Sequence, residues 1–176
     1  MKLVKFSYKK VMSTNKIALK KIKNGFKQGI VISEQQTKGK GRYGRKWIST
    51  KGNLFVSIFF TISPKFNIKK LTRLNNKLII TILRTLIKKK LSLKAPNDIL
   101  INGKKVCGIL QEVFRYKNKN FLIVGIGVNI KNSPIVNEYH TTYINNYAVK
   151  NIPIDKIYLK FKKIYERNIS NLYLCI

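Results

Sequence analysis

The sequence predicts an α+β domain with a mixed, mostly antiparallel β-sheet and helices packed on one side of it. Three observations support this fold class. Short apolar runs typical of strands outnumber amphipathic helical stretches, three such runs follow one another in the second half of the chain, and Asn102-Gly103 separates two of them. The length of 176 residues and the hydrophobic content of 44% suit a single domain, 1–176, with an ordinary core.

The first half of the chain is expected to contain three strands and two helices. In order, these are a strand at 3–8, a helix over 16–22, a strand at 29–33, a strand at 54–62 and a helix over 68–87. Residues 13–15 are expected to cap the first helix, and Asn24-Gly25 to end it. Apolar residues at steps of three and four, from Ile68 to Leu86, predict the second helix. Residues 34–53 have few apolar anchors and predict a long loop, which in a compact domain is usually functional or mobile.

The second half is expected to form consecutive strands and a final helix. Pro96 keeps the residue before it extended. Strands at 99–101 and 105–114 flank the Asn-Gly pair, which supplies the positive φ angles of a type I′ hairpin. A strand at 121–130 follows a polar turn, and a helix over 154–169 closes the chain.

The chain carries 37 Lys and Arg against 6 Asp and Glu, a formal charge of +31. Such a balance suggests a polyanionic partner, either a nucleic acid or an anionic membrane surface. The basic residues are mostly lysines spread along the chain, however, as the codons of an AT-rich genome would produce. We therefore favour a solvated basic surface over dedicated nucleic-acid binding, and expect no specific DNA and no membrane partner. Non-specific attraction to polyanions should depend on salt.

Cys107 and Cys175 lie far apart in the sequence, and His140 is the one histidine. Neither a zinc-ligand spacing nor a disulfide framework follows from these residues, so no dedicated metal site is expected. The first twenty residues lack the apolar core of a signal peptide, and no apolar run approaches a membrane span of about 20 residues. A reduced, cytoplasmic setting is expected.

Residues 37–47, TKGKGRYGRKW, contain a literal match to the dinucleotide-binding pattern G-x-G-x-x-G. A Rossmann turn needs a helix directly after its glycines, because the helix N-terminus binds the pyrophosphate. Here a strand follows, Gly52 would break any helix, and the loop carries cations where Rossmann loops rely on backbone amides. A flexible loop that brings glycine backbone and cations to a phosphate is the better interpretation, and a merely exposed basic loop is the alternative.

Five segments, in one order along the chain, resemble those of the biotin–protein ligases. The most specific is QTKGKGRYGRKW (36–47), which resembles the family's loop Q-T-x-G-R-G-R-x-G-R-x-W. The others are MSTN (12–15), KAPND (94–98), GKKVCGILQE (103–112) and GIGVNI (125–130), which resemble D-S-T-N, K-W-P-N-D, K-x-x-G-I-L-x-E and G-I-G-[IVL]-N. The resemblance covers nearly the whole chain.

The resemblance implies the class II synthetase-like fold of the biotin and lipoate ligases and a two-step reaction. Biotin's carboxylate attacks the α-phosphate of ATP, assisted by Mg²⁺, to give biotinyl-5′-AMP and pyrophosphate. A lysine of a biotin carboxyl carrier domain, from acetyl-CoA carboxylase or a related carboxylase, then attacks the mixed anhydride and releases AMP. The family also suggests a homodimer through a sheet edge. The chain is expected to be the catalytic domain alone, without the N-terminal winged helix or the C-terminal β-barrel.

The resemblance also carries roles to individual residues. Lys105 and Arg42 are the expected catalytic residues: the lysine would contact the biotin carboxylate and the α-phosphate, and the arginine would close over the adenylate. The expected contacts to biotin or the adenylate are Ser13, Thr14, Asn15, Gln36, Gly39, Lys40, Gly41, Arg42, Arg45, Trp47, Lys105 and Gly108. Supporting residues on the nucleotide and metal side would be Asn97, Asp98 and Asn129.

The same residues have simpler interpretations when each is taken alone. Ser13 and Thr14 suit a helix cap. Lys105 suits an exposed strand position, and Asp98 and Glu112 suit surface charges that offset nearby lysines.

Four positions depart from the family's pattern: Met12 replaces the usual Asp, Lys40 an Arg, Tyr43 a frequent Arg, and Ala95 the usual Trp. Lys40 keeps the charge without the bidentate geometry of arginine. Ala95 removes a large aromatic side chain, which bears on substrate affinity more than on chemistry. Two alternatives therefore stay open. One is a lipoate–protein ligase, although the R-R-x-[ST]-G-G-G loop of that family is absent from the sequence. The other is a catalytically weak relative that only holds biotin.

Overall fold

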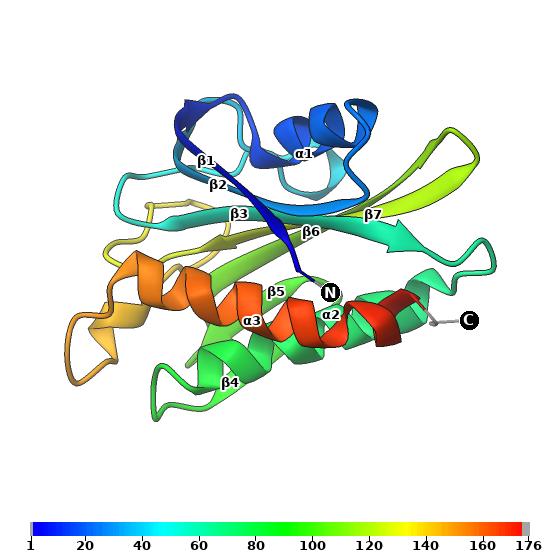
Figure 1. Cartoon of the computed structure of the whole chain (residues 1–176). Helices are drawn as coiled ribbons and strands as arrows, with labels where there is room; N and C mark the ends of the chain where they lie inside the picture. The colour runs from blue at the N-terminus through cyan, green and yellow to red at the C-terminus, as the bar shows by residue number, and fades with distance from the viewer. Residues whose placement is uncertain (1, 174–176) are drawn as a thin grey trace.

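The computed structural model describes residues 2–173, which form a seven-stranded sheet with three α-helices (Figure 1). The strand order is β1-β2-β3-β7-β6-β5-β4; β1 and β2 run parallel, and every other neighbouring pair runs antiparallel. The predicted α+β fold with a mixed, mostly antiparallel sheet is confirmed. The elements are β1 (Val4–Val11), α1 (Thr14–Lys23), β2 (Gln28–Gln36), β3 (Leu54–Ile62), α2 (Ile68–Arg84), β4 (Leu91–Lys94), β5 (Asp98–Ile101), β6 (Lys104–Tyr116), β7 (Lys119–Val128) and α3 (Ile154–Tyr173).

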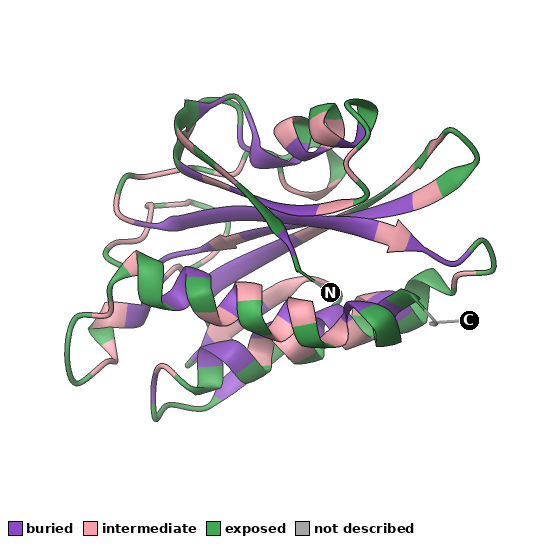
Figure 2. Cartoon of the chain, viewed as in Figure 1, coloured by how far each residue is buried: buried purple, intermediate pink, exposed green. Residues whose placement is uncertain are grey.

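Helices cover both faces of the sheet (Figure 1). The two long helices, α2 and α3, lie together on one side as expected, whereas α1 lies on the opposite face. The reason is that β2, β3 and β7 are apolar on both faces, and each face needs a cover (Figure 2). Ala18 and Ile22 of α1 pack against Val31, Phe59 and Ile123 on the second face.

Both tight hairpins have left-handed residues at their turns. Asn102 (φ 49°) and Gly103 (φ 76°) connect β5 to β6, as the predicted type I′ turn requires. Lys117 (φ 44°) and Asn118 (φ 60°) connect β6 to β7 in the same way. This second hairpin fixes the register between β6 and β7, on which the candidate site depends.

Several boundaries differ from the sequence prediction. β4 was not predicted, because four residues are too few for a pattern, and neither was the short 3₁₀ turn Ile144–Asn146. β2 continues to Gln36, into the predicted loop, because its neighbour β1 pairs with it as far as Val11. α2 ends at Arg84, short of the predicted residue 87, and α3 continues to Tyr173.

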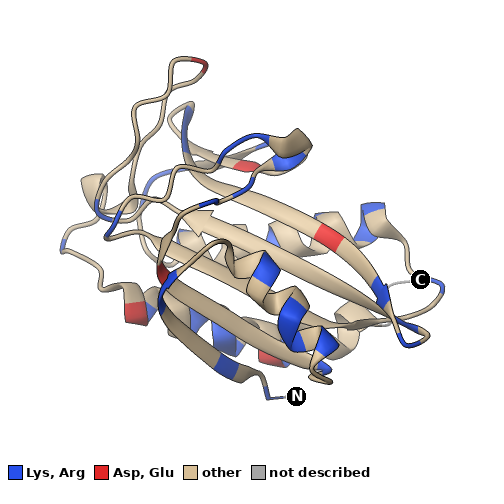
Figure 3. Ribbon diagram, turned by 90° about the horizontal axis from the view of Figure 1, so that it is seen from above, with Lys and Arg blue, Asp and Glu red and all other residues tan. Residues whose placement is uncertain are grey.

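Lys and Arg are distributed over helices, strands and loops (Figure 3). The basic residues are therefore spread over the fold in three dimensions as they are along the sequence (Figure 3). A cationic surface of this kind attracts polyanions in a salt-dependent way without providing a shaped binding site.

A buried asparagine, Asn75 on α2, ties the two long helices to the sheet. Its side chain donates to the Gln111 side chain on β6 at 2.9 Å and to the Leu71 carbonyl at 3.0 Å, and it accepts from the Tyr165 hydroxyl on α3 at 2.9 Å. Burial raises the pKa of Tyr165, so the hydroxyl stays protonated and remains a donor. An unpaired buried polar group costs about 1–3 kcal/mol, so this network favours one placement of the helices.

Glu166 on α3 binds the backbone of Leu3, the residue that precedes β1. Its Oε1 accepts from the Leu3 amide at 2.8 Å and pairs with Lys162 Nζ at 2.5 Å. Burial by itself would raise the pKa of Glu166, but the hydrogen bonds from Lys162 and Leu3 outweigh it and hold the pKa below its ordinary value.

We expect Glu166→Gln to lower the free energy of unfolding by about 1 kcal/mol at pH 7, and by less at pH values below about 4. A carboxyl whose pKa is depressed in the folded state stabilises the fold above its unfolded pKa of about 4.3, and this contribution is lost as the pH falls through the folded-state pKa. Urea unfolding at neutral and acidic pH measures the difference. Glu34→Gln, at an exposed position, is the matched control. An equal loss at both pH values would contradict the ion-pair contribution.

Candidate active site

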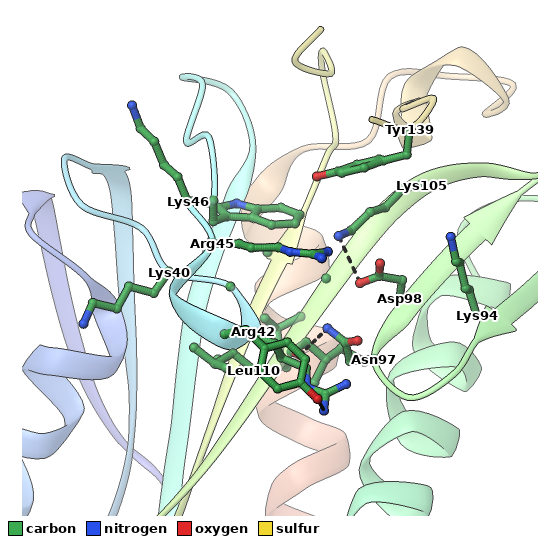
Figure 4. Close-up of a pocket in the computed structure, with 18 of the residues that line it drawn as sticks. Lys40, Arg42, Arg45, Lys46, Lys94, Asn97, Asp98, Lys105, Leu110 and Tyr139 are labelled. Carbon is green, nitrogen blue, oxygen red and sulfur yellow. Dashed lines mark hydrogen bonds and ion pairs between the residues drawn. The ribbon is translucent and has the colours of Figure 1, made fainter. Parts of the chain in front are cut away.

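A cavity of about 520 Å³ lies over β6 and β7, bordered by the start of α1, the glycine loop at 39–47 and the turn at 95–97 (Figure 4). It is large enough for a small-molecule substrate. The predicted site residues that line it are Ser13, Thr14, Asn15, Gln36, Lys40, Gly41, Arg42, Arg45, Trp47, Asn97, Asp98, Lys105 and Gly108. Two predicted residues, Gly39 and Asn129, are not part of its wall.

One end of the cavity is lined by neutral polar groups at the start of α1. The Thr14 amide donates to Gln36 Oε1 at 2.8 Å, and Thr14 Oγ1 lies 3.1 Å from the same oxygen. Ser57, on β3 beneath, brings its Oγ within 2.7 Å of Thr14 Oγ1 and 2.5 Å of Asn15 Oδ1. Asn15 Nδ2 donates to Glu112 Oε2 at 2.6 Å.

The side chains at the start of α1 do not cap the helix. Ser13 occupies the N-cap position but makes no capping hydrogen bond, so the simpler helix-cap interpretation of this residue is wrong. Ser13 and Thr14 are both buried and line the cavity. Their hydroxyl groups are therefore available to the cavity or to the sheet instead of to the helix backbone.

Glycines form the floor of the cavity. Gly108 on β6 pairs with Gly127 on β7, and the Trp47 indole lies against both. An added Cβ would lie 2.5 Å from a Trp47 ring atom at Gly108 and 2.4 Å at Gly127. At Gly125 it would lie 2.3 Å from Asn15 Oδ1. The indole and the amide can reach the sheet because these positions have no side chains.

The glycine loop is folded back on itself. Lys40 pairs with Lys46 as an isolated bridge, the Gly41 amide donates to the Arg45 carbonyl at 2.7 Å, and the Trp47 amide donates to the Gly39 carbonyl at 2.9 Å. Gly39 is therefore buried at the base of the loop, where an added Cβ would lie 2.7 Å from the Trp47 carbonyl oxygen.

At the tip of the loop, Tyr43 takes a left-handed conformation (φ 55°) and its ring is exposed. The Arg42 guanidinium lies against that ring, 4.7 Å from its centroid, and donates to the Tyr43 hydroxyl at 2.9 Å. Lys40 and Lys46 point away from the cavity, whereas Arg45 points toward Lys105 (Figure 4).

Lys105 marks the cationic end of the cavity. Its Nζ lies 3.0 Å from Asp98 Oδ1, 5.4 Å from the Trp47 ring centroid and 4.8 Å from that of Tyr139 (Figure 4). Only 14% of its side chain is exposed, so the interpretation as an ordinary exposed strand lysine is wrong. Asp98 likewise is an ion-pair partner at the cavity and not a free surface charge.

Cations outnumber acids around the cavity. Its wall contains Lys40, Arg42, Arg45, Lys46, Lys94 and Lys105, against Asp98 and Glu138. This balance favours an anionic ligand at the Lys105 end.

Two asparagines hold the walls beside Lys105. Asn97 donates through Nδ2 to the Ile109 carbonyl at 3.2 Å, and its own carbonyl accepts from the Ile109 amide at 2.9 Å. Asn129 is buried behind the cavity, where its Nδ2 donates to the Thr142 carbonyl at 3.0 Å. Asn129 borders a small side cleft together with Trp47, and Asn129 Oδ1 and Trp47 Nε1 are buried without a hydrogen-bond partner among the described residues.

Ser57 and Tyr139 are among the residues that contact the predicted site but were not predicted from the sequence. Ser57 was detectable, since it is a polar residue inside the apolar strand LFVSIFFTI. Tyr139 was not, because its loop has no periodic pattern; hydrogen bonds from the Lys105 amide to the His140 carbonyl and from the Thr142 amide to the Lys105 carbonyl dock this loop, each at 2.9 Å.

Other chemistry is limited within residues 2–173. No three His, Cys, Asp or Glu side chains in this stretch lie close enough together to hold a metal ion. Burial raises the pKa of the Cys107 thiol, so it stays protonated; the second cysteine, Cys175, lies outside the described residues. None of the described helices has the length and apolar character needed to cross a bilayer.

Comparison with known proteins adds to this geometry. Among curated proteins, the bifunctional ligase/repressor BirA of Bacillus subtilis is 33% identical over 128 residues, which cover 69% of this chain and 39% of that protein. The biotin–[acetyl-CoA-carboxylase] ligase of Paracoccus denitrificans is 31% identical over 128 residues, 69% of this chain and 52% of that protein. The matched part of the chain thus corresponds to about two fifths to one half of the length of these relatives.

Among solved structures, the biotin protein ligase of Aquifex aeolicus in complex with biotin and ATP has a TM-score of 0.79 at 32% identity, covering 97% of this chain and 72% of that one. The resemblance to biotin–protein ligases and to the fold of their catalytic domain is confirmed. The model of the biotin/lipoate A/B protein ligase family matches residues 8–129, which run from within β1 to the end of β7 and include the glycine loop and Lys105. The chain therefore belongs to the biotin/lipoate A/B protein ligase family.

Proposed function

We propose that the chain is the catalytic domain of an ATP-dependent biotin–protein ligase, which forms biotinyl-5′-AMP and transfers biotin to a lysine of a biotin carboxyl carrier domain. One observation carries this proposal: a single cavity joins a neutral hydrogen-bonding end at Thr14 to a cationic end at Lys105. The first end suits the ureido ring of biotin. The second suits the carboxylate and phosphates that must meet during activation.

The first step brings two anions together, and Lys105 offsets their repulsion. A biotin carboxylate oxygen attacks the α-phosphorus of ATP, and pyrophosphate leaves. The ammonium of Lys105 would contact both the carboxylate and the α-phosphate, and Asp98, 3.0 Å away, holds it in place. Trp47 and Tyr139 flank the ammonium and exclude water from it.

Beside Lys105, Trp47 Nε1 is a donor and Asn129 Oδ1 an acceptor, and neither has a hydrogen-bond partner among the described residues. Both atoms are buried, and the side cleft that their residues border is too small for an adenine ring. Magnesium would come bound to the ATP phosphates, which it usually binds with few protein carboxylates, and it would supply further positive charge.

The glycine loop would retain the reactive adenylate. Arg42 and Arg45 are planar donors suited to phosphate oxygens, and Gly41 lets the backbone approach closely. In the second step the acceptor lysine's amine attacks the acyl carbon, AMP leaves, and biotin is held by an amide bond. A loop that covers the anhydride until the acceptor arrives limits its loss to water.

The polar end favours biotin over lipoate, which the same family also includes. The groups at Thr14, Asn15, Gln36 and Ser57 are hydrogen-bonding, whereas the dithiolane ring of lipoate offers neither N–H nor O–H. Biotin-dependent release of pyrophosphate from ATP tests the function directly. Folded protein that binds biotin but releases no pyrophosphate above background would indicate a relative that only holds biotin.

Lys105→Ala should abolish biotin-dependent pyrophosphate release, since the attacking carboxylate and the α-phosphate lose their shared cation. We expect a loss of at least a hundredfold in kcat, on the order found when one transition-state donor is removed. Lys104→Ala, at the exposed neighbouring position, is the control and should retain activity. Comparable activity in both variants would contradict the role of Lys105.

Arg42→Gly should raise the labelling of bystander proteins, because the adenylate would escape from a weakened cap. Biotinylation of serum albumin by purified enzyme, detected with streptavidin, measures this escape. Lys38→Gly introduces the same flexibility and loses the same charge at an exposed loop position outside the cavity wall. Unchanged selectivity in the Arg42 variant would contradict the capping role.

Gly127→Ala should displace the indole from the glycine floor, since the new methyl would overlap Trp47. Trp47 is the one tryptophan in the sequence, so the emission of the protein reports on it directly. We expect a red-shifted maximum as the ring meets water. Gly41→Ala is the control for emission, because its added Cβ meets nothing closer than 3.5 Å. An unshifted spectrum in the Gly127 variant would contradict the packing.

A further inference from the structure

The polar groups at the α1 end of the cavity form a chain that ends at a carboxylate. Asn15 Nδ2 donates to Glu112 Oε2 at 2.6 Å, and Asn15 Oδ1 lies 2.5 Å from Ser57 Oγ. Ser57 Oγ in turn lies 2.7 Å from Thr14 Oγ1. Thr14, Asn15 and Ser57 are buried, whereas Glu112 is exposed on β6. The chain therefore connects a solvated negative charge to the wall of the cavity.

The chemistry of the groups determines which one donates and which one accepts along this series of hydrogen bonds. A carboxylate only accepts, so Asn15 must turn its NH₂ group to Glu112 and its carbonyl oxygen to Ser57. That carbonyl oxygen also only accepts, so it takes the single hydroxyl proton of Ser57. Ser57 then has only lone pairs left for Thr14, so the single Thr14 hydroxyl proton is directed either to Ser57 Oγ, 2.7 Å away, or to Gln36 Oε1, 3.1 Å away.

The Thr14 oxygen is left with lone pairs for the cavity. Gln36 Oε1, which lies 3.1 Å away, already accepts from the Thr14 amide at 2.8 Å. Whichever of the two oxygens receives it, the Thr14 hydroxyl proton is used within the protein, so neither Thr14 Oγ1 nor Gln36 Oε1 offers a donor to the cavity. This part of the wall therefore suits a ligand that provides N–H or O–H.

We propose that Glu112, acting through Asn15 and Ser57, is a positioning residue that makes this wall an acceptor and thereby selects a head group with N–H donors. The inference rests on the proposed function, because the ureido ring of biotin supplies two N–H groups and a dithiolane ring supplies none. Glu112 touches no reacting atom. It acts by fixing the direction of the hydrogen bonds along this chain.

The packing of Asn15 prevents the chain from relaxing. Its Oδ1 lies against Gly125 on β7, where an added Cβ would be only 2.3 Å away. The amide is held between the sheet, Ser57 and Glu112, so it cannot turn without losing a partner. The alternative is a purely structural role, in which Glu112 supplies the negative charge that the first turn of α1 lacks. A test must separate the two.

Two ligands separate the roles: biotin, and its cyclic-ketone analogue with CH₂ in place of both ureido N–H groups. For Glu112→Leu and Ser57→Ala, we expect the Kd for biotin to rise about 5- to 20-fold, while the Kd for the analogue changes less than about twofold. The KM for ATP should stay unchanged. Glu34→Gln removes an exposed charge elsewhere and should alter neither Kd. Equal weakening of both ligands would mean a structural role and overturn the proposal.

A paired exchange provides the rescue. Asn15→Asp sets two carboxylates against each other, so biotin binding should weaken at least tenfold. Adding Glu112→Gln lets the new amide donate to the new carboxylate while Ser57 still donates to it, and biotin affinity should return to within about threefold of wild type. Failure of the double variant to recover overturns the proposal.

The wild-type protein distinguishes the two levels of inference. If it neither binds biotin nor releases pyrophosphate in its presence, the proposed function fails and the role of Glu112 fails with it. If it does both and the biotin-to-analogue ratio is unmoved in the variants, only the role of Glu112 fails.

Discussion

The pairing of Gly108 with Gly127 across β6 and β7 is the constraint on which the site depends. It leaves a bare area of sheet just wide enough for the Trp47 indole. The backbone amide of Trp47 donates a hydrogen bond to the Gly39 carbonyl and so closes the glycine loop. Packing of the indole on the sheet therefore also fixes where the loop rejoins the sheet. A slip of β6 by one residue would turn side chains such as Cys107 or Ile109 toward the ring and turn the core-facing ones outward. The tight β6–β7 hairpin is what prevents that slip.

One lysine, Lys105, differs from the other basic residues around the cavity in how it is placed. The protein has a formal charge of +31, and Lys40 and Lys46 point outward (Figure 4). Lys105 differs because it is mostly buried, paired with Asp98 and flanked by two rings. A cation held in that way loses little freedom when an anion arrives, whereas an outward lysine must be ordered and desolvated first. Overall charge therefore attracts anions to the protein, and the fixed ion pair favours one place in the cavity for them to bind.

The sequence predicted what depends on local pattern and missed what depends on packing. The Asn102-Gly103 hairpin and the long helices follow from turn chemistry and periodicity, and the five motif segments supply most of the residues that line the cavity. The side of the sheet that α1 covers could not be predicted, because it depends on both faces of β2, β3 and β7 being apolar at once. Tyr139 was missed for a related reason. Backbone hydrogen bonds between its loop and Lys105 hold it at the cavity, and no sequence pattern predicts such bonds.

A motif also names residues without giving the direction of their protons. Thr14 can donate or accept, and its role in the cavity is decided by Ser57 on β3 and by Glu112 on β6, far along the chain. Placing the carboxylate at the surface keeps it solvated, which avoids the large cost of burying a charge. It also keeps this carboxylate out of the neutral end of the cavity wall, since Glu112 is not among the residues that line the cavity. The carboxylate sets the direction of the hydrogen bonds between the neutral amide and hydroxyl groups, while the charge itself stays outside the wall. One cavity can therefore offer acceptors at one end and cations at the other.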